Sequence, residues 1–181
     1  MPEPILRRLD FTATVLLLLW VGAAVGIGLL AVPQMFTLLP NREWAATVGG
    51  SLVVRGDVLA FFAFGFALAL VTIPRWLDHI DDPVPIGPYK LWIAAALLAL
   101  LMSFASLTVV TPRIMELRAK HQNQSMSLSL DHPDRKAIRK AHAISSQFFV
   151  IRLLLGLGLA LGISRLPMKR REPQADKMAS S

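Results

Sequence analysis

Long stretches without charge constrain this chain more than any other feature. Residues 11–32 carry no charge over 22 positions, residues 91–110 carry none over 20, and residues 144–163 carry only Arg152 over 20. A helix rises about 1.5 Å per residue, so about 20 apolar residues cross the roughly 30 Å hydrocarbon layer of a bilayer. Helices of soluble proteins show a polar stripe, which segments such as 94–102 lack. These runs predict three membrane spans.

A fourth span requires a helix that carries charge. The apolar run 58–73 has only 16 residues and reaches spanning length only if the helix continues back through Asp57 and Arg55 to residue 44. No proline interrupts residues 44–73, which favours this continuation. The composition agrees, because 54% of the residues are hydrophobic and only 17% are charged, whereas soluble domains carry about 25% charged residues.

The expected fold is therefore all-α: an integral membrane four-helix bundle with up-down topology and both termini on one side. We expect spans at about 11–32, 44–73, 89–110 and 143–164, within a membrane domain of residues 1–166. Residues 167–181 form a charged tail that is expected to be disordered. The expected location is the cell membrane, as a multi-pass protein. Basic residues divide nine to eight between the two sides, so they predict no orientation.

Proline positions predict where these helices end. Pro33 and Pro40 are expected to close the first helix, and Pro74 to begin the connection between the second and third. Pro112 follows the third apolar run, and a helix is expected to continue beyond it through residues 113–120.

Charged residues inside the predicted spans form a candidate polar layer of Arg55, Asp57 and Arg152. Counted from the same side, all three lie about 15–20 Å along their helices. Charge inside a bilayer is costly and normally has a partner, so an Asp57–Arg152 ion pair is predicted. Arg55 lies two residues from Asp57, points to a different face and needs another partner. A structural role and a functional role of this layer are equally compatible with the sequence.

Glycine pairs indicate where helices could approach closely. Gly22 and Gly26 have GxxxG spacing in the first span, and Gly158 and Gly162 have it in the last. Such spacing lets helix backbones come together. We expect these pairs to pack within one chain in preference to forming a dimer.

No cofactor or metal site is predicted. The chain has no Cys, which excludes thiolate metal sites and iron–sulfur clusters. Its four His form no HxxxH or HExxH motif, and His121 and His132 are assigned to a polar loop. His142 at the mouth of the last span is a weak candidate for axial haem ligation or metal capture, but a dipole or interface role is favoured.

An enzyme is the minority interpretation, because no nucleophile–base set, carboxylate pair or phosphate-cradling glycine loop is visible. The net charge of +7 does not indicate nucleic acid, because the basic residues lie at span ends, where they meet anionic lipid head groups. The candidate partners are membrane lipids and either a second copy of the chain or another membrane protein.

Three short motifs occur in order along the chain: Pro33-x-x-Phe36, Thr111-Pro112 and His142-x-x-Ser145-Ser146. With four spans and a charged loop before the last, residues 10–165 resemble the transmembrane protein 205-like family, a "domain of unknown function" group of small four-helix membrane proteins. The resemblance implies an uncharacterised molecular activity; the animal member is associated with platinum-drug resistance and vesicular export. Two features depart from the family: Phe149 stands where members often carry Asn, and residues 54–57 replace a Phe-Pro step.

Three functions remain open at this point. The first is a membrane scaffold or accessory protein that works through helix packing and its basic loop. The second is an ion or small-molecule permease subunit that uses the Arg/Asp layer, although inverted repeats and broken helices, which mark many transporters, are not visible. The third is a haem- or copper-binding membrane protein that uses His142.

Overall fold

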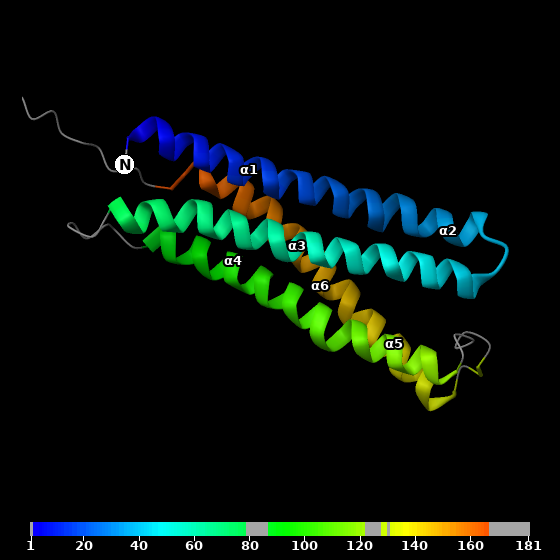
Figure 1. Cartoon of the computed structure of the whole chain (residues 1–181). Helices are drawn as coiled ribbons and strands as arrows, with labels where there is room; N and C mark the ends of the chain where they lie inside the picture. Colours follow the sequence, from blue (N-terminus) through cyan, green and yellow to red (C-terminus); the bar gives the residue numbers. More distant parts are fainter. Residues whose placement is uncertain (1, 79–86, 122–127, 130, 167–181) are drawn as a thin grey trace, which may run out of the picture.

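The computed structural model describes residues 2–78, 87–121, 128–129 and 131–166. Of these described residues 92% are helical, and no strand occurs among them. Four long helical segments lie side by side with their axes roughly aligned (Figure 1). The all-α fold is confirmed. The charged tail 167–181 lies outside the described residues.

Two of the four segments change their helical type along their length. The first segment consists of α1 (Glu3–Val25), the π-helical η1 (Gly26–Ala31) and α2 (Val32–Leu38). The second is the single helix α3 (Arg42–Asp78). The third consists of α4 (Gly87–Ala105), the π-helical η2 (Ser106–Val110) and α5 (Thr111–Lys120), and the fourth is α6 (Pro133–Ile163).

The proline predictions were wrong at two positions. Pro33 does not close the first helical segment, which continues to Leu38, and Pro74 lies inside α3. A proline inside a helix lacks its N–H, and its ring clashes with the carbonyl four residues earlier. At Pro33 a π-helical stretch comes directly before, and its wider turn changes the hydrogen-bond pattern at the point of conflict. A π-helical stretch also precedes Pro112, and α5 continues from there to Lys120, as expected.

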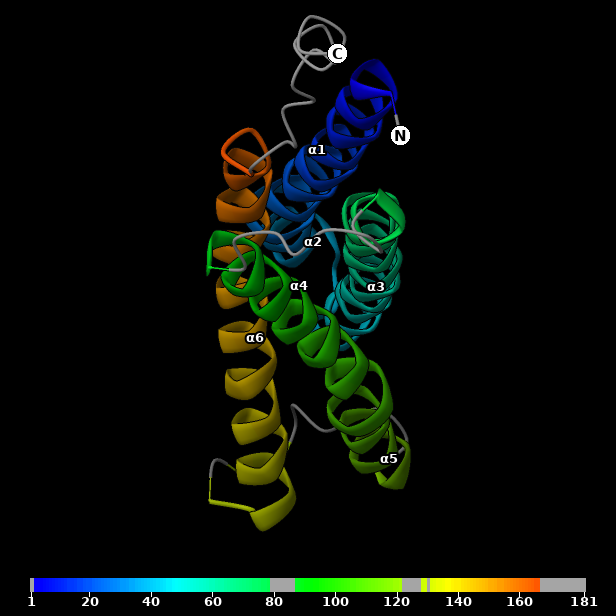
Figure 2. The ribbon, with the colours of Figure 1, turned by 90° about the vertical axis from the view of Figure 1, so that its left-hand side faces the viewer.

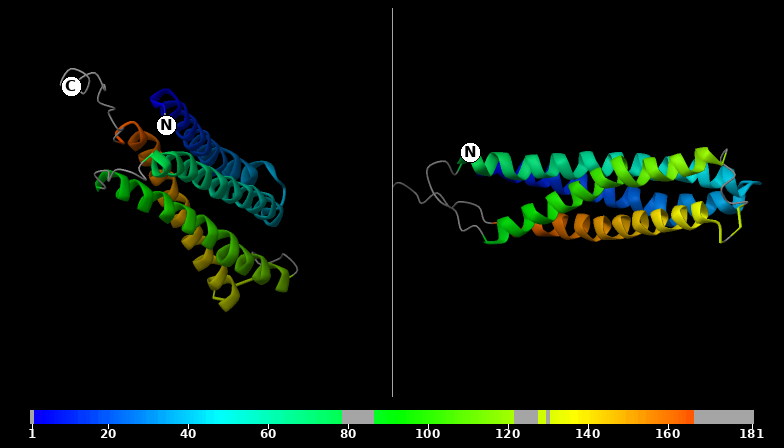
Figure 3. Two further views of the ribbon diagram at one scale, coloured as in Figure 1. Left: turned by 60° about the vertical axis from the view of Figure 1, so that its left-hand side comes forward. Right: turned by 90° about the horizontal axis from the view of Figure 1, so that it is seen from below.

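The four segments form a closed square of neighbours. The α1 segment packs against α3 and α6, and α4 packs against the same two helices. Figure 2 shows α3 and α6 on opposite sides of α4, with α1 behind, and Figure 3 shows the four rods from two further directions. Consecutive segments run in opposite directions, so the end of α6 lies at the same end of the bundle as the start of α1 (Figure 1).

The core of the bundle combines small side chains with a few large rings. Buried alanines such as Ala13, Ala60 and Ala96 bring the helices together around Trp20 and Phe64, whose ring centroids lie 4.9 Å apart. The indole of Trp20 donates a hydrogen bond to the Gly56 carbonyl at 3.3 Å, and that of Trp92 donates to the Leu159 carbonyl at 3.1 Å. Buried indole N–H groups need such acceptors. These two bonds fix α1 on α3 and α4 on α6.

The outer surface of the bundle is strongly apolar. Leu19, Phe66, Leu101 and Leu161 are each more than half exposed and come from all four segments. A water-soluble monomer rarely exposes large continuous apolar surface. Among the described residues, four helices are long and apolar enough to cross a membrane.

The glycines with GxxxG spacing mostly do not pack inside the chain, so that prediction was wrong. A Cβ added at Gly22, Gly26 or Gly158 would meet no atom within 4 Å, and only Gly162 has a close neighbour, the ring of Trp92 at 3.4 Å. Spacing alone does not reveal which face of a helix the pair occupies.

Two other glycines make the close helix contacts. A Cβ at Gly28 would lie 2.8 Å from the Phe149 ring, and a Cβ at Gly156 would lie 2.9 Å from the Trp20 ring. Both contacts join the α1 segment to α6. Aromatic rings occupy the space that a larger residue would need, so a side chain at either position would force a ring to shift.

Candidate functional site

The centre of the candidate site is the ion pair between Asp57 of α3 and Arg152 of α6. One guanidinium nitrogen of Arg152 lies 2.5 Å from Asp57 Oδ1. The two residues are only 2% and 1% exposed, which makes this one of the most deeply enclosed polar contacts described. The pair that the sequence predicts is therefore present, and it ties α3 to α6 across the bundle.

Two serines that sequence analysis did not single out complete this centre. Ser106 donates a hydrogen bond to Asp57 Oδ2 at 2.5 Å, and Ser103 accepts one from Arg152 Nη1 at 3.2 Å. Both serines are fully buried, and Ser103 in turn donates to the Ala99 carbonyl at 2.9 Å. Two serines three residues apart share one helix face. That spacing within an apolar run was the available signal.

Arg152 has a hydrogen bond on each of its three nitrogens. Nη2 donates to Asp57, Nη1 to Ser103, and Nε to the Phe148 carbonyl at 3.2 Å. Both carboxylate oxygens of Asp57 also accept hydrogen bonds. Buried charges are tolerated when their hydrogen-bonding capacity is used in this way. We call Asp57, Ser103, Ser106 and Arg152 the central layer.

Arg55 does not belong to the central layer. Its side chain is exposed on the outer face of α3, two residues before Asp57. This agrees with the expectation that the two point in different directions. The additional partner that the sequence analysis expects for Arg55 is not found among the hydrogen bonds and ion pairs of the described residues.

A second buried ion pair lies toward the end of the bundle that holds the start of α1. Asp10 of α1 accepts two hydrogen bonds from the Arg75 guanidinium of α3, at 2.7 and 2.6 Å. Arg75 also donates to the Val71 carbonyl at 3.1 Å, which accepts from the Tyr89 hydroxyl of α4 at 3.0 Å. The exposures are 4% for Arg75 and 7% for Asp10. These contacts join α1, α3 and α4. We call Asp10, Arg75 and Tyr89 the outer layer.

The two layers stand well apart along α3. Asp57 and Arg75 are 18 residues apart in one uninterrupted helix. At about 1.5 Å per residue this separation is about 27 Å. Between them, residues 58–74 of α3 carry no charged side chain.

At the opposite end, α3, α5 and α6 meet around Arg118. One guanidinium nitrogen donates to the Ala46 carbonyl at 3.1 Å, and the other lies 3.3 Å from His142 Nε2. The Nε atom is buried and has no hydrogen-bond partner among the described residues. An arginine can only donate, so Nε2 of His142 is the acceptor in this contact. One of the two ring nitrogens of His142 that can bind a metal is therefore engaged by a cation.

The residues that carry the family resemblance gather at this same end. Pro33 and Phe36 lie on α2, Thr111 and Pro112 begin α5, and His142, Ser145 and Ser146 lie on α6. Figure 1 shows α2 and α5 at the end opposite the N-terminus. A Cβ added at Gly49 would lie 3.6 Å from Val32, and one added at Gly50 would lie 3.5 Å from Arg118, so α2 and α5 both approach one glycine pair of α3.

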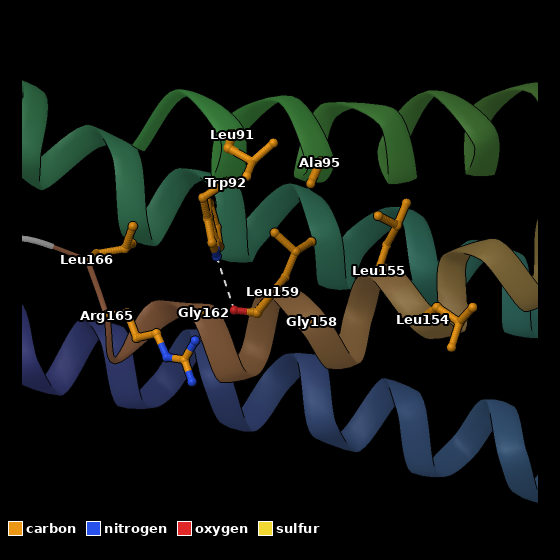
Figure 4. A pocket seen from close by; sticks show the side chains of 10 residues that line it. All are labelled: Leu91, Trp92, Ala95, Leu154, Leu155, Gly158, Leu159, Gly162, Arg165 and Leu166. Carbon is orange, nitrogen blue, oxygen red and sulfur yellow. Dashed lines mark hydrogen bonds between the residues drawn. The ribbon is translucent and has the colours of Figure 1, made fainter. Parts of the chain in front are cut away.

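An apolar groove of about 330 Å³ lies on the outside of the bundle between α4 and α6. Figure 4 shows Leu91, Trp92 and Ala95 of α4 facing Leu155 and Leu159 of α6. Gly158 leaves its floor open, because a side chain there would meet nothing within 4 Å. Arg165 lies at the end of α6 beside this groove (Figure 4). The groove is distinct from both buried ion pairs.

Comparisons with known proteins identify no relative of this chain. No family model, no curated protein and no solved structure matches it.

Proposed function

We propose that this chain is a multi-pass protein of the cell membrane and acts as a small scaffold or accessory protein. We also propose that it is related to the transmembrane protein 205-like proteins that its sequence resembles. The observation that carries it is the closure of the central layer. Asp57 and Arg152 satisfy each other and two serines, so the buried charges serve to fix the helices. The protein then acts through the outward faces of the bundle and through its polar end, where α5 ends and α6 begins.

The spacing of the two layers supports a position in the bilayer. The roughly 27 Å between Asp57 and Arg75 is close to the roughly 30 Å thickness of the hydrocarbon region. We therefore place one layer near each border of that region. This position reduces the cost of burying the charges, because charge is most costly at the bilayer centre.

Arg55 fits the same placement. It lies 20 residues before Arg75, about 30 Å along α3. An exposed arginine at the membrane border can extend its side chain to the head groups while its stem stays in the apolar region. A guanidinium facing lipid in the middle of the bilayer would have no such route. The portions of α5 and α6 beyond this border carry charged residues such as Arg113 and Arg139.

The outward surface offers room for a neighbouring membrane helix or lipid. Leu154 and Leu161 of α6 are each 64% exposed, and Gly158 between them leaves the groove floor bare. A scaffold needs such lateral contact surface, whereas a carrier needs a polar path through the bundle.

The test uses photo-crosslinking in native membranes. A photoreactive amino acid is introduced at Leu154 or Leu161, with the buried Ile163 of the same helix, 2% exposed, as the matched control. A scaffold gives discrete protein adducts from the outward positions and none from Ile163. Only lipid adducts at the outward positions would contradict a protein-contacting role.

The permease interpretation predicts gradient-driven uptake of protons or small ions into vesicles that contain the protein, whereas the scaffold proposal predicts none. We expect no gradient-driven uptake of protons or small ions above that of protein-free vesicles. Uptake that requires both Asp57 and Arg152 would replace the scaffold proposal with the permease.

A further inference from the structure

Three potential metal ligands converge where α5 ends and α6 begins. His121 follows the last residue of α5, His132 caps the first turn of α6, and Asp134 lies in that turn. One ligand atom from each residue lies within 4.8 Å of the other two. The two imidazole rings meet edge to face with centroids 5.4 Å apart, and His121 Nε2 lies 2.8 Å from Asp134 Oδ2.

We propose that His121, His132 and Asp134 bind one divalent transition-metal ion, Zn²⁺ or Cu²⁺. Two imidazole nitrogens with one carboxylate oxygen form a donor set that suits these ions, whereas Mg²⁺ and Ca²⁺ prefer oxygen alone. Three protein ligands leave a fourth position of a tetrahedral Zn²⁺ site for water. Because one ligand atom from each residue lies within 4.8 Å of the other two, small movements of the side chains would bring all three around one ion.

Each ligand already uses the lone pair or charge that the ion would take. His132 Nδ1 accepts the backbone N–H of Asp134 at 3.2 Å, so the ion takes the lone pair of this nitrogen by displacing that hydrogen bond. His121 Nε2 donates to the carboxylate, and the ion takes this nitrogen once the ring proton moves to Nδ1. The ion therefore replaces two hydrogen bonds within the cluster.

Lys120 competes with the ion for the carboxylate. Its ammonium lies 2.8 Å from Asp134 Oδ2, and its side chain is 63% exposed. Because the chain is long and mostly in water, it can move aside without losing solvation. Its positive charge nevertheless opposes a second cation on the same oxygen, so Lys120 sets the affinity without blocking the site.

Metal binding would add a link between α5 and α6, which already meet through Arg118 and His142 and through Lys120 and Asp134. The ion would tie the end of α5 to the start of α6 at the polar end of the bundle, beyond the layer of Asp57. This role is independent of the scaffold proposal, because it concerns a metal ion held by three side chains and not contact with a neighbouring membrane protein.

The test is titration of ZnCl₂ into the full chain without a polyhistidine tag, in mild detergent and after chelator treatment, followed by isothermal titration calorimetry. We expect one ion per chain. His121→Gln and His132→Asn should each weaken binding at least tenfold, since even partners of metal ligands contribute about 10–100-fold. Asn at position 132 can still cap α6, so this variant separates loss of a ligand from loss of a helix cap. His142→Gln is the matched control and should bind as the original chain does.

A second pair of variants tests the geometry. Lys120→Gln should tighten Zn²⁺ binding several-fold, because it removes the competing charge, while Lys136→Gln, which removes a cation that pairs with Asp131, should leave the affinity unchanged. Circular dichroism of each variant verifies that the helices persist. The proposal is overturned by absence of binding up to about 1 mM Zn²⁺, or by equal affinity in the original chain and the His121 and His132 variants.

Discussion

The substitution Asp57→Asn is expected to destabilise the bundle strongly. Asn keeps the shape of the side chain but removes its charge, and Arg152, only 1% exposed, then has no counter-charge. Removing one partner of a buried ion pair costs about 3–5 kcal/mol. Arg152→Gln should cost a similar amount, because it leaves the carboxylate of Asp57 with the Ser106 hydrogen bond and no cation.

The double variant separates a true pair from two unrelated buried charges. Asp57→Asn combined with Arg152→Gln leaves two neutral amides that can hydrogen-bond each other. The combined loss should be smaller than the sum of the single losses by about 0.5–3 kcal/mol, which is the usual coupling of contacting residues. The exposed pair Arg113–Glu116, 2.8 Å apart on α5, is the control, and its coupling should be near zero because exposed pairs contribute little.

The assay is reversible unfolding of the purified protein in mixed micelles with increasing dodecyl sulfate, followed by tryptophan fluorescence. Trp20 reports on the site directly, because its indole donates to the Gly56 carbonyl beside Asp57. Strictly additive losses in the four-variant cycle would refute the claim that the two charges stabilise each other. A single substitution that leaves stability unchanged would refute it as well.

Other positions give independent predictions. Gly156→Ala should lower the unfolding free energy in the same assay by about 1–3 kcal/mol, because its Cβ would lie 2.9 Å from the Trp20 ring; Gly158→Ala, which points into open space, should leave stability unchanged, and equal effects at both positions would contradict the packing described. Asp10→Asn should cost about 1–3 kcal/mol, because it leaves the buried Arg75 short of its carboxylate; a variant as stable as the original chain would show that the outer layer does not fasten α1 to α3.

The sequence predicts the central ion pair because the physical constraints there are strict. Asp57 and Arg152 have opposite charge, lie in apolar surroundings and stand at similar distances along helices that enter from the same side. A buried charge needs a partner, and few candidates exist. The continuation of α3 through residues 55–57 follows from the absence of proline in residues 44–73 and from the length that a span needs.

Other features are not predictable from local patterns. Asp10 and Arg75 stand next to span ends, where charged residues are usually solvated, so nothing in the sequence indicates that they meet. The rule that proline ends a helix fails at Pro33, where a π-helical segment comes directly before and the helix continues. The cluster of His121, His132 and Asp134 depends on how α5 and α6 come together in space, which residue spacing does not reveal.

The helix faces were likewise hidden from the sequence. GxxxG spacing identifies a pair of glycines on one face but does not tell whether that face points inward, and Gly22 and Gly26 turn out to face open space. The glycines that matter for packing, Gly28 and Gly156, are defined by the rings of Phe149 and Trp20 on neighbouring helices. Only the tertiary arrangement supplies that information.

Aqueous labelling of single cysteines in native membranes tests the central claim most directly. The chain has no cysteine of its own, so Phe66→Cys and Leu101→Cys, both at exposed positions on the apolar surface, can be compared with Arg139→Cys on the polar part of α6. The account predicts that a charged maleimide modifies position 139 and reaches positions 66 and 101 only after the membrane is dissolved in a denaturing detergent. Equally fast labelling of all three positions in intact membranes would contradict a bundle whose apolar faces lie in lipid.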